Sequence, residues 1–233
     1  MRPSPHVRVC GNNDGMDLTR WLQPTRCLDA DHPQVRAFAD AACGAATDPV
    51  ARAVRLYYAV RDGLRYDPYS VDLTEEGLTA STVLARGRGY CVAKAGVLAT
   101  VARAAGIPAR LGFADVRNHL ATPRLLELMG TDIFYYHGYT ELFLDARWVK
   151  ATPAFNLELC QRFGVRPLEF DGRADSLFHP FDATGRQHME YVRDHGPRDD
   201  MPVDELREAM ARHYPMMAGA TVDGDFHAEA GEG

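Results

Sequence analysis

The stretch Gly-Arg-Gly-Tyr-Cys-Val-Ala-Lys-Ala, residues 87–95, places Cys91 where a glycine-rich turn meets an alanine-rich segment. The small residues that follow predict a helix from Cys91 to Ala105 that ends at Gly106. Because small side chains allow close packing, we expect this helix to be central in the fold. A thiol in the first turn of a helix faces unsatisfied backbone N–H groups, which favour the thiolate. The stretch therefore predicts a reactive cysteine on a central helix.

His137 opens the clearest predicted β-hairpin, which turns at Asp145-Ala146. A two-residue turn sets position 144 opposite 147 and position 139 opposite 152. With this register His137, Tyr139 and Thr152 share one face of the sheet. A thiolate and a neighbouring imidazole are the minimum set of groups needed for nucleophilic attack on a carbonyl.

Helices precede the central helix and strands follow it, so the sequence predicts a segregated α+β fold. We expect one domain over residues 18–214, between flexible tails at 1–17 and 215–233. The segment 65–80 is expected to be an extended loop. Predicted helices span 33–45, 49–64 with Asp48 as N-cap, 123–129, 157–163 and 203–213, and predicted strands span 109–116, 137–144, 147–152, 165–170 and 189–192.

Composition narrows the classes of function. The net charge of −6 over 233 residues argues against a nucleic-acid partner, which usually needs a basic face. No apolar run is long enough to cross a bilayer, and the polar N-terminus lacks the apolar core of a signal peptide, so we expect a cytoplasmic protein with no membrane partner. None of the five cysteines forms a C-x-x-C pair, which predicts neither a zinc site nor a disulfide framework. Cys10, Cys27, Cys43 and Cys160 are interpreted as free thiols or small buried residues.

Three blocks resemble the core of the transglutaminase-like superfamily, a group of cysteine enzymes and their relatives with a papain-like arrangement. The blocks are Gly89-Tyr90-Cys91 at a helix start, Gly106-Ile107-Pro108-Ala109-Arg110 at its end, and His137 with Trp148-Val149 in the hairpin. The similarity covers roughly residues 48–156. It implies a stand-alone domain of bacterial type, in which N-terminal helices and a central cysteine-bearing helix pack on an antiparallel sheet. By the same resemblance Cys91 is the nucleophile and His137 the general base.

The third catalytic residue departs from the family pattern. An aspartate is expected in a W-V-x-x-D-P motif, but this chain has Thr152 at that position, in Trp148-Val149-Lys150-Ala151-Thr152-Pro153. A hydroxyl can orient an imidazole but cannot stabilise an imidazolium as a carboxylate does. Asn156 and Asp115 are the substitutes, and the sequence does not rank them.

Other polar and aromatic residues have weaker signals. Tyr90, Tyr136 and Tyr139 are candidates for substrate binding, with packing as the alternative. Metal-capable side chains occur from His179 to Glu190, but their spacing matches no metal template, so we predict neither a metal nor a cofactor.

These observations predict an acyl-transfer enzyme that forms a thioester on Cys91 from an amide, ester or thioester. The acyl donor would be a peptide or a small molecule, free or bound to a carrier. Water as acceptor gives a protease or amidase, an amine gives a transglutaminase or amide synthase, and a carbon nucleophile gives a carbon–carbon bond. One alternative is an inactive transglutaminase-like binding module, and another is a metal-dependent hydrolase that uses residues 179–190.

Overall fold

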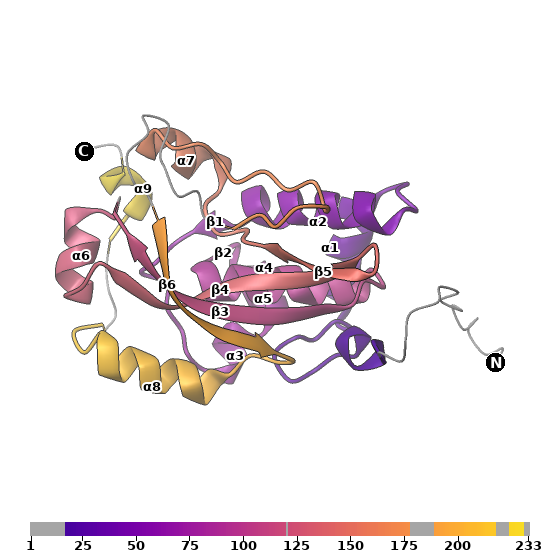
Figure 1. Ribbon diagram of the computed structural model, residues 1–233, viewed down its shortest axis with the longest axis horizontal. Coiled ribbons are helices and arrows are strands. Elements are labelled where there is room, and N and C mark those ends of the chain that lie inside the picture. The colour runs from indigo at the N-terminus through magenta and orange to yellow at the C-terminus, as the bar shows by residue number, and fades with distance from the viewer. Residues whose placement is uncertain (1–16, 120, 178–188, 218–223, 231–233) are drawn as a thin grey trace.

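A four-stranded antiparallel sheet forms one layer of the molecule, with strand order β5-β4-β3-β6 (Figure 1). A computed structural model describes residues 17–119, 121–177, 189–217 and 224–230 of the chain. The strands are β3 (Ala109–Asn118), β4 (Ile133–Leu144), β5 (Arg147–Ala151) and β6 (Met189–Arg198). The predicted α+β class is confirmed.

The β4–β5 hairpin has the predicted turn and register. Asp145 and Ala146 have φ of 45° and 64°, the left-handed conformation that a tight two-residue hairpin turn requires. Leu144 pairs with Arg147, and the last described pair is Thr140 with Ala151. Continuing this register by one residue sets Thr152 opposite Tyr139, as predicted.

Helix α5 (Cys91–Ala104) is the centre of the fold, as its small residues predicted. Every residue from Cys91 to Arg103 is buried, and the helix ends before Gly106, which has a φ of 77°. One face contacts the sheet, where the Thr140 hydroxyl donates to the Ala95 carbonyl at 2.8 Å. The other faces contact α1 (Pro33–Cys43), α2 (Pro49–Gly63) and α4 (Ala80–Arg86).

Local signals set the ends of most other helices. The Asp48 carboxylate accepts from the Ala51 N–H, and Pro49 occupies the first turn of α2, as predicted. Three further predicted helices are confirmed to the residue. They are α6 (Pro123–Met129), α7 (Leu157–Phe163) and α8 (Val203–His213).

The prediction of an extended loop over 65–80 is wrong in part. Strand β1 (Arg65–Tyr66) pairs in parallel with β2 (Arg88–Gly89), so a short two-stranded sheet holds the entry to α5. Helix α3 (Glu75–Leu78) begins after Thr74, whose hydroxyl accepts from the Gly77 N–H. A single helical turn gives too short a periodic pattern to be detected in the sequence.

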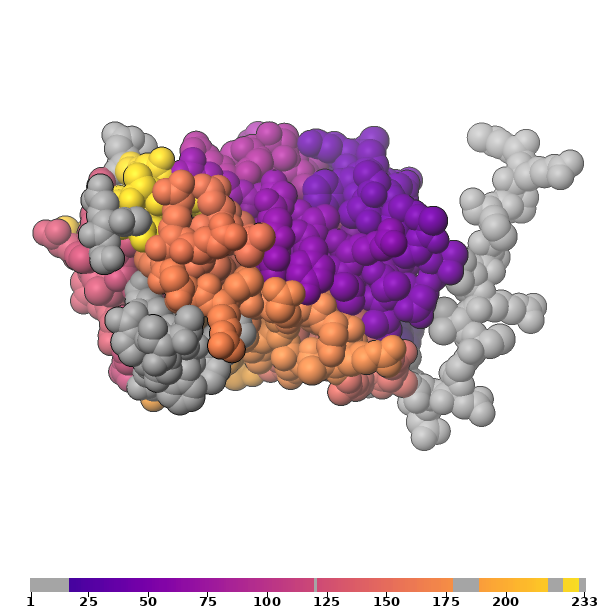
Figure 2. All heavy atoms as spheres, turned by 90° about the horizontal axis from the view of Figure 1, so that it is seen from above, coloured from indigo at the N-terminus to yellow at the C-terminus, as the bar shows by residue number. Residues whose placement is uncertain are grey.

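The predicted strand at 165–170 is also wrong. Its backbone bonds to side chains of α2: the Leu168 carbonyl accepts from the Tyr57 hydroxyl at 2.9 Å and from Arg61 Nη1 at 2.7 Å. Figure 2 shows this segment (orange) along the violet surface of α2, while α7, which precedes it, lies beside the yellow α9 (Phe226–Glu229). A short apolar run whose backbone bonds to side chains has the same sequence pattern as a run that pairs in a β-sheet. The predicted strand at 189–192 exists but continues to Arg198.

The chain after residue 214 is more than a loose tail. Phe226 and Ala230 belong to the main hydrophobic core, and Met217 packs against it. The His227 Nε2 lies 3.2 Å from the Tyr66 carbonyl oxygen, which ties α9 to the short sheet before α5. The prediction of a flexible tail at 215–233 is therefore wrong for residues 224–230. Most of the predicted N-terminal tail lies outside the described residues.

Among the described residues, no helix has the length and apolar character needed to cross a membrane. The cytoplasmic location stays a prediction.

Candidate active site

Strand β4 touches the first turn of α5 at Gly138. A Cβ placed on Gly138 would lie 2.8 Å from the Val92 Cα and 3.4 Å from the Ala95 Cβ. These distances leave no room for a side chain, so glycine allows the two backbones to approach each other. Because His137 precedes Gly138 and Cys91 precedes Val92, this contact brings the two predicted catalytic residues to one place.

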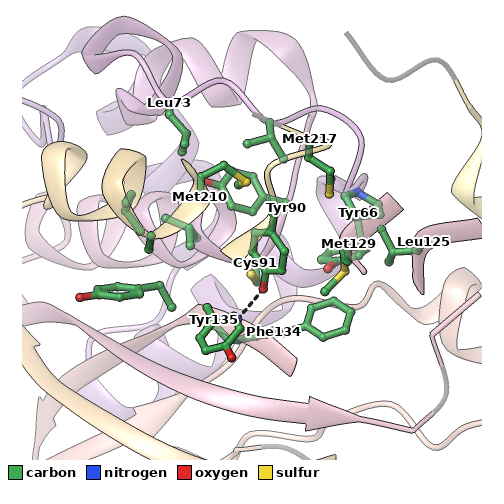
Figure 3. A pocket seen from close by; sticks show the side chains of 18 residues that line it. Tyr66, Leu73, Tyr90, Cys91, Leu125, Met129, Phe134, Tyr135, Met210 and Met217 are labelled. Carbon is green, nitrogen blue, oxygen red and sulfur yellow. Dashed lines mark hydrogen bonds between the residues drawn. The ribbon is translucent and has the colours of Figure 1, made fainter. Parts of the chain in front are cut away.

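Cys91 and His137 line the same pocket, which encloses about 620 Å³ of empty space including its open mouth. Tyr90 and Tyr136, two of the three predicted substrate-binding residues, also line it. Figure 3 shows Cys91 in the middle of these side chains, with Leu125 and Met129 of α6 on one side and Met210 of α8 on another. The pocket therefore opens onto the predicted nucleophile.

Burial decides the charge state of Cys91. The residue is only 7% exposed, and desolvation raises the pKa of its thiol to about 11. The backbone N–H groups of Gly138, Val92 and Cys91 itself act in the opposite direction and lower it. The expectation that the helix start favours a thiolate is thus wrong for this conformation, because burial outweighs the N–H groups.

Burial also keeps His137 neutral. Its side chain is almost fully enclosed, and desolvation lowers the pKa of the imidazole to about 3, against a smaller opposing effect from the Gly138 backbone. A neutral thiol beside a neutral imidazole is the expected pair at pH 7. Burial of both side chains therefore disfavours a thiolate–imidazolium ion pair.

The side chains of Asn156 and Asp115 make hydrogen bonds with other residues, whereas within the described chain the hydroxyl of Thr152, the third candidate to orient His137, does not. The Asn156 side-chain oxygen accepts from the Tyr66 N–H at 3.1 Å and so fixes β1. Thr152 is buried, its N–H donates to the Ser176 carbonyl at 2.9 Å, and its carbonyl accepts from the Tyr57 hydroxyl. The Thr152 hydroxyl has no hydrogen-bond partner within the described part of the chain. Among the described residues, it is the only one of the three candidate side chains without a hydrogen bond.

Asp115, the third candidate, belongs to a cluster around Tyr136. Its Oδ1 lies 2.7 Å from His195 Nε2 and accepts from the Tyr136 N–H at 3.0 Å. Tyr136 has a φ of 54°, a rare backbone conformation for a residue with a side chain, and its ring stacks on His195 at a centroid distance of 4.1 Å. We call Asp115, His195 and Tyr136 the Tyr136 clamp. It holds the residue before His137.

Tyr139 does not take the predicted substrate-binding role. It packs with Ala114 and Val116 in a separate small cluster, its hydroxyl donates to Asp194 at 3.3 Å, and Lys150 Nζ lies 4.8 Å from its ring centroid. Tyr139 is not among the residues that line the pocket, although it lies two positions from His137 and so shares its face of β4.

The pocket walls include residues that the sequence reasoning missed. Tyr214 follows α8, and its hydroxyl donates to the Ile133 carbonyl at 2.9 Å and accepts from the Tyr135 N–H at 2.5 Å. Leu206 and Met210 lie one turn apart on α8, a spacing that could have marked an apolar face. Only the tertiary structure shows that this face covers Cys91.

The described residues hold no group of three or more His, Cys, Asp or Glu side chains that could bind a metal ion. Residues 178–188, which include most of the predicted metal-capable segment, lie outside the described residues.

Comparison with known proteins identifies the family. The profile of the transglutaminase-like superfamily matches residues 36–153, which include Cys91, His137 and Thr152. No curated protein sequence matches the chain.

Three solved structures are similar. A "Putative Cysteine Protease" from Cytophaga hutchinsonii has a TM-score of 0.48 and 16% identity, over 80% of this chain and 55% of its own. The periplasmic domain of TgpA from Pseudomonas aeruginosa has a TM-score of 0.41 and 26% identity, over 58% and 46%. A "Putative Protease" from Parabacteroides distasonis has a TM-score of 0.38 and 17% identity, over 57% and 26%. This chain thus spans about half or less of each of these chains. By its match over residues 36–153, the chain belongs to the transglutaminase-like superfamily.

Proposed function

We propose that the protein is an acyl-transfer enzyme that forms a thioester on Cys91, with His137 as general base. The observation that carries this proposal is that both residues line one pocket, next to the close contact of β4 with α5 at Gly138. A nucleophile and a base from different elements, held together by a backbone contact, fit the logic of covalent catalysis.

The steps balance with these two residues alone. His137 takes the thiol proton as the Cys91 sulfur attacks the carbonyl carbon, and the C=O electron pair moves to oxygen. Collapse of this intermediate expels the leaving group, which takes the proton from His137. Water or an amine then attacks the thioester, His137 accepts its proton, and that proton returns to the departing sulfur.

The electrostatics of the pocket favour proton transfer during attack over a standing ion pair. With the thiol pKa near 11 and the imidazole pKa near 3, charge should develop only as the oxyanion forms. The backbone N–H of Cys91 at the helix start is a candidate donor to that oxyanion. The buried Thr152 hydroxyl is the candidate to orient His137, because it has no hydrogen-bond partner among the described residues and the hairpin register sets it diagonal to His137 on one face of the sheet.

Mass spectrometry of the intact protein tests the proposal. Acyl thioesters, peptides and glutamine amides should be screened for a stable acyl adduct on the wild type. Cys91→Ala should abolish the adduct. Cys160→Ala is a matched control, because Cys160 is also buried with its pKa raised to about 11 but lies in α7, among residues that do not line the pocket. An adduct that survives Cys91→Ala would overturn the proposal.

A second candidate function is a binding module that keeps the fold without the chemistry. The threonine at position 152 and the neutral, buried cysteine–histidine pair favour it. This reading predicts reversible ligand binding that Cys91→Ala leaves intact and no covalent adduct with any acyl donor. Screening the same compounds by thermal shift separates the two functions.

A further inference from the structure

The described side chains that line the pocket beside Cys91 are apolar, aromatic or neutral. Charged residues make up 25% of the chain, yet none of the described residues that line this pocket is Asp, Glu, Lys or Arg. Most of the lining consists of methionine, leucine, valine and aromatic side chains from five separate segments. A charged ligand group would lose its hydration there without gaining a partner, which makes its entry costly.

Tyr90 supplies a buried polar group to the wall. Tyr90 lines the pocket, its side chain is about nine-tenths buried, and its hydroxyl has no hydrogen-bond partner within the described residues. A buried hydroxyl without a partner carries a desolvation cost that a ligand acceptor could remove. Tyr90 and Cys91 line the same pocket, so one ligand could contact both.

We propose that the acyl group accepted at Cys91 is an uncharged, apolar one, an aliphatic chain of several carbons, rather than a glutamine side chain or a charged acyl group. This inference rests on the proposed function, since it assigns the substrate class of the same site. The carbonyl lies at Cys91, the hydrocarbon lies along Leu125, Met129, Leu206 and Met210, and the Tyr90 hydroxyl donates to a substrate oxygen.

A series of p-nitrophenyl esters tests the substrate class. Acetyl, butyryl, hexanoyl and octanoyl esters should acylate the protein with kcat/KM that rises about fourfold for each buried methylene until the pocket is full. An ester of adipic acid, which matches hexanoyl in length but ends in a carboxylate, should react at least about tenfold more slowly than hexanoyl. Acylation is read by p-nitrophenol release and by adduct mass.

A matched pair of lysine substitutions tests whether this pocket sets the preference for apolar acyl groups. Met210→Lys puts a cation on a half-buried wall position of α8, where it can fold without burying the charge completely. It should lower kcat/KM for the hexanoyl ester about tenfold. The difference in kcat/KM between the hexanoyl and adipoyl esters should become smaller or change sign. Met216→Lys adds the same charge at a residue that is 62% exposed and should leave the series unchanged. Tyr90→Phe should slow every ester by a similar factor.

The outcomes separate the two proposals. Acylation of Cys91 without chain-length preference, or with preference for the adipoyl ester or a glutamine amide, overturns the apolar substrate and leaves the thioester mechanism standing. If no ester forms an adduct on Cys91, the mechanism fails. The substrate class is then tested by thermal shift with hexanamide and adipamic acid, where stabilisation by the charged ligand or by neither would overturn it.

Discussion

His137 follows Tyr136 in strand β4, whereas His195 stacks its ring on Tyr136 from strand β6. His137 lines the pocket with Cys91, and burial lowers its pKa to about 3. His195 has the hydrogen-bonded carboxylate, Asp115, that a general base usually uses. His195 and its carboxylate are not among the described residues that line the pocket with the thiol. A His–Asp pair can therefore hold a backbone segment in place without facing the pocket of a cysteine.

The largest expected effect separates the two histidines directly. His137→Gln should lower the rate of Cys91 acylation about 10³-fold, because it removes the proposed general base. His195→Gln should lower it about tenfold, because it only loosens the Tyr136 clamp. Stopped-flow measurement of the p-nitrophenol burst checks both. A larger loss for His195→Gln would reverse the assignment of roles.

The contact between β4 and α5 comes next. Gly138→Ala should lower acylation about 10²-fold and the free energy of unfolding by about 1–3 kcal/mol, because its Cβ would force β4 from the first turn of α5. Gly63→Ala is the control, since a Cβ at Gly63 meets nothing within 4 Å. That variant should keep full activity and unfold at the same or slightly higher denaturant concentration. Equal behaviour of the two variants would show that the contact does not position the site.

A double-mutant cycle examines the clamp itself. Asp115→Asn should cost about 1–3 kcal/mol in the free energy of unfolding and slow acylation about tenfold, because it weakens bonds to His195 and to the Tyr136 N–H. In the His195→Gln background the same change should cost less, since the shared bond is already lost. Additive losses would mean that the two residues act separately. A positioning role also predicts a larger change in kcat than in KM.

The last expected effect is on acid stability, and acylation at pH 7 does not enter it. The pKa of His137 is lower in the folded protein than its usual 6.5, so the folded state binds this proton less readily. Its contribution to stability is complete above pH 6.5 and is lost as the pH falls towards 3, by up to about 1.4 kcal/mol per unit. His137→Gln should therefore lose less stability than the wild type between pH 6.5 and 4.5, measured by urea unfolding.

If His137→Gln follows the wild-type pH curve, then His137 is not titrating from a buried neutral state in the folded protein.

Short-range signals decided much of this fold in advance. Asp48 with Pro49 set the start of α2, and the small residues after Cys91 set a helix that could be buried on all sides. The two-residue turn at Asp145-Ala146 fixed the hairpin register, because strand pairing follows from turn length. These features were predictable because each depends on residues a few positions apart.

Some features of the site could be predicted from the sequence and others could not. Cys91 and His137 were identified from their local settings and from the family resemblance, and the structure brings them to one pocket. The partner of Asp115 was not predictable, because His195 reaches it across the pairing of β3 with β6. The charge of the thiol was predicted wrongly, since desolvation depends on every residue that covers it.

The sequence by itself thus determined the helix with Cys91, the hairpin with His137 and the family to which both belong. Only the tertiary structure decided which carboxylate meets which histidine, and that apolar side chains from α6 and α8 close over the thiol. The cause is the distance along the sequence over which each interaction acts. Helix caps and tight turns act over a few residues, whereas burial and its effect on pKa sum over groups that the folded chain brings together from distant positions.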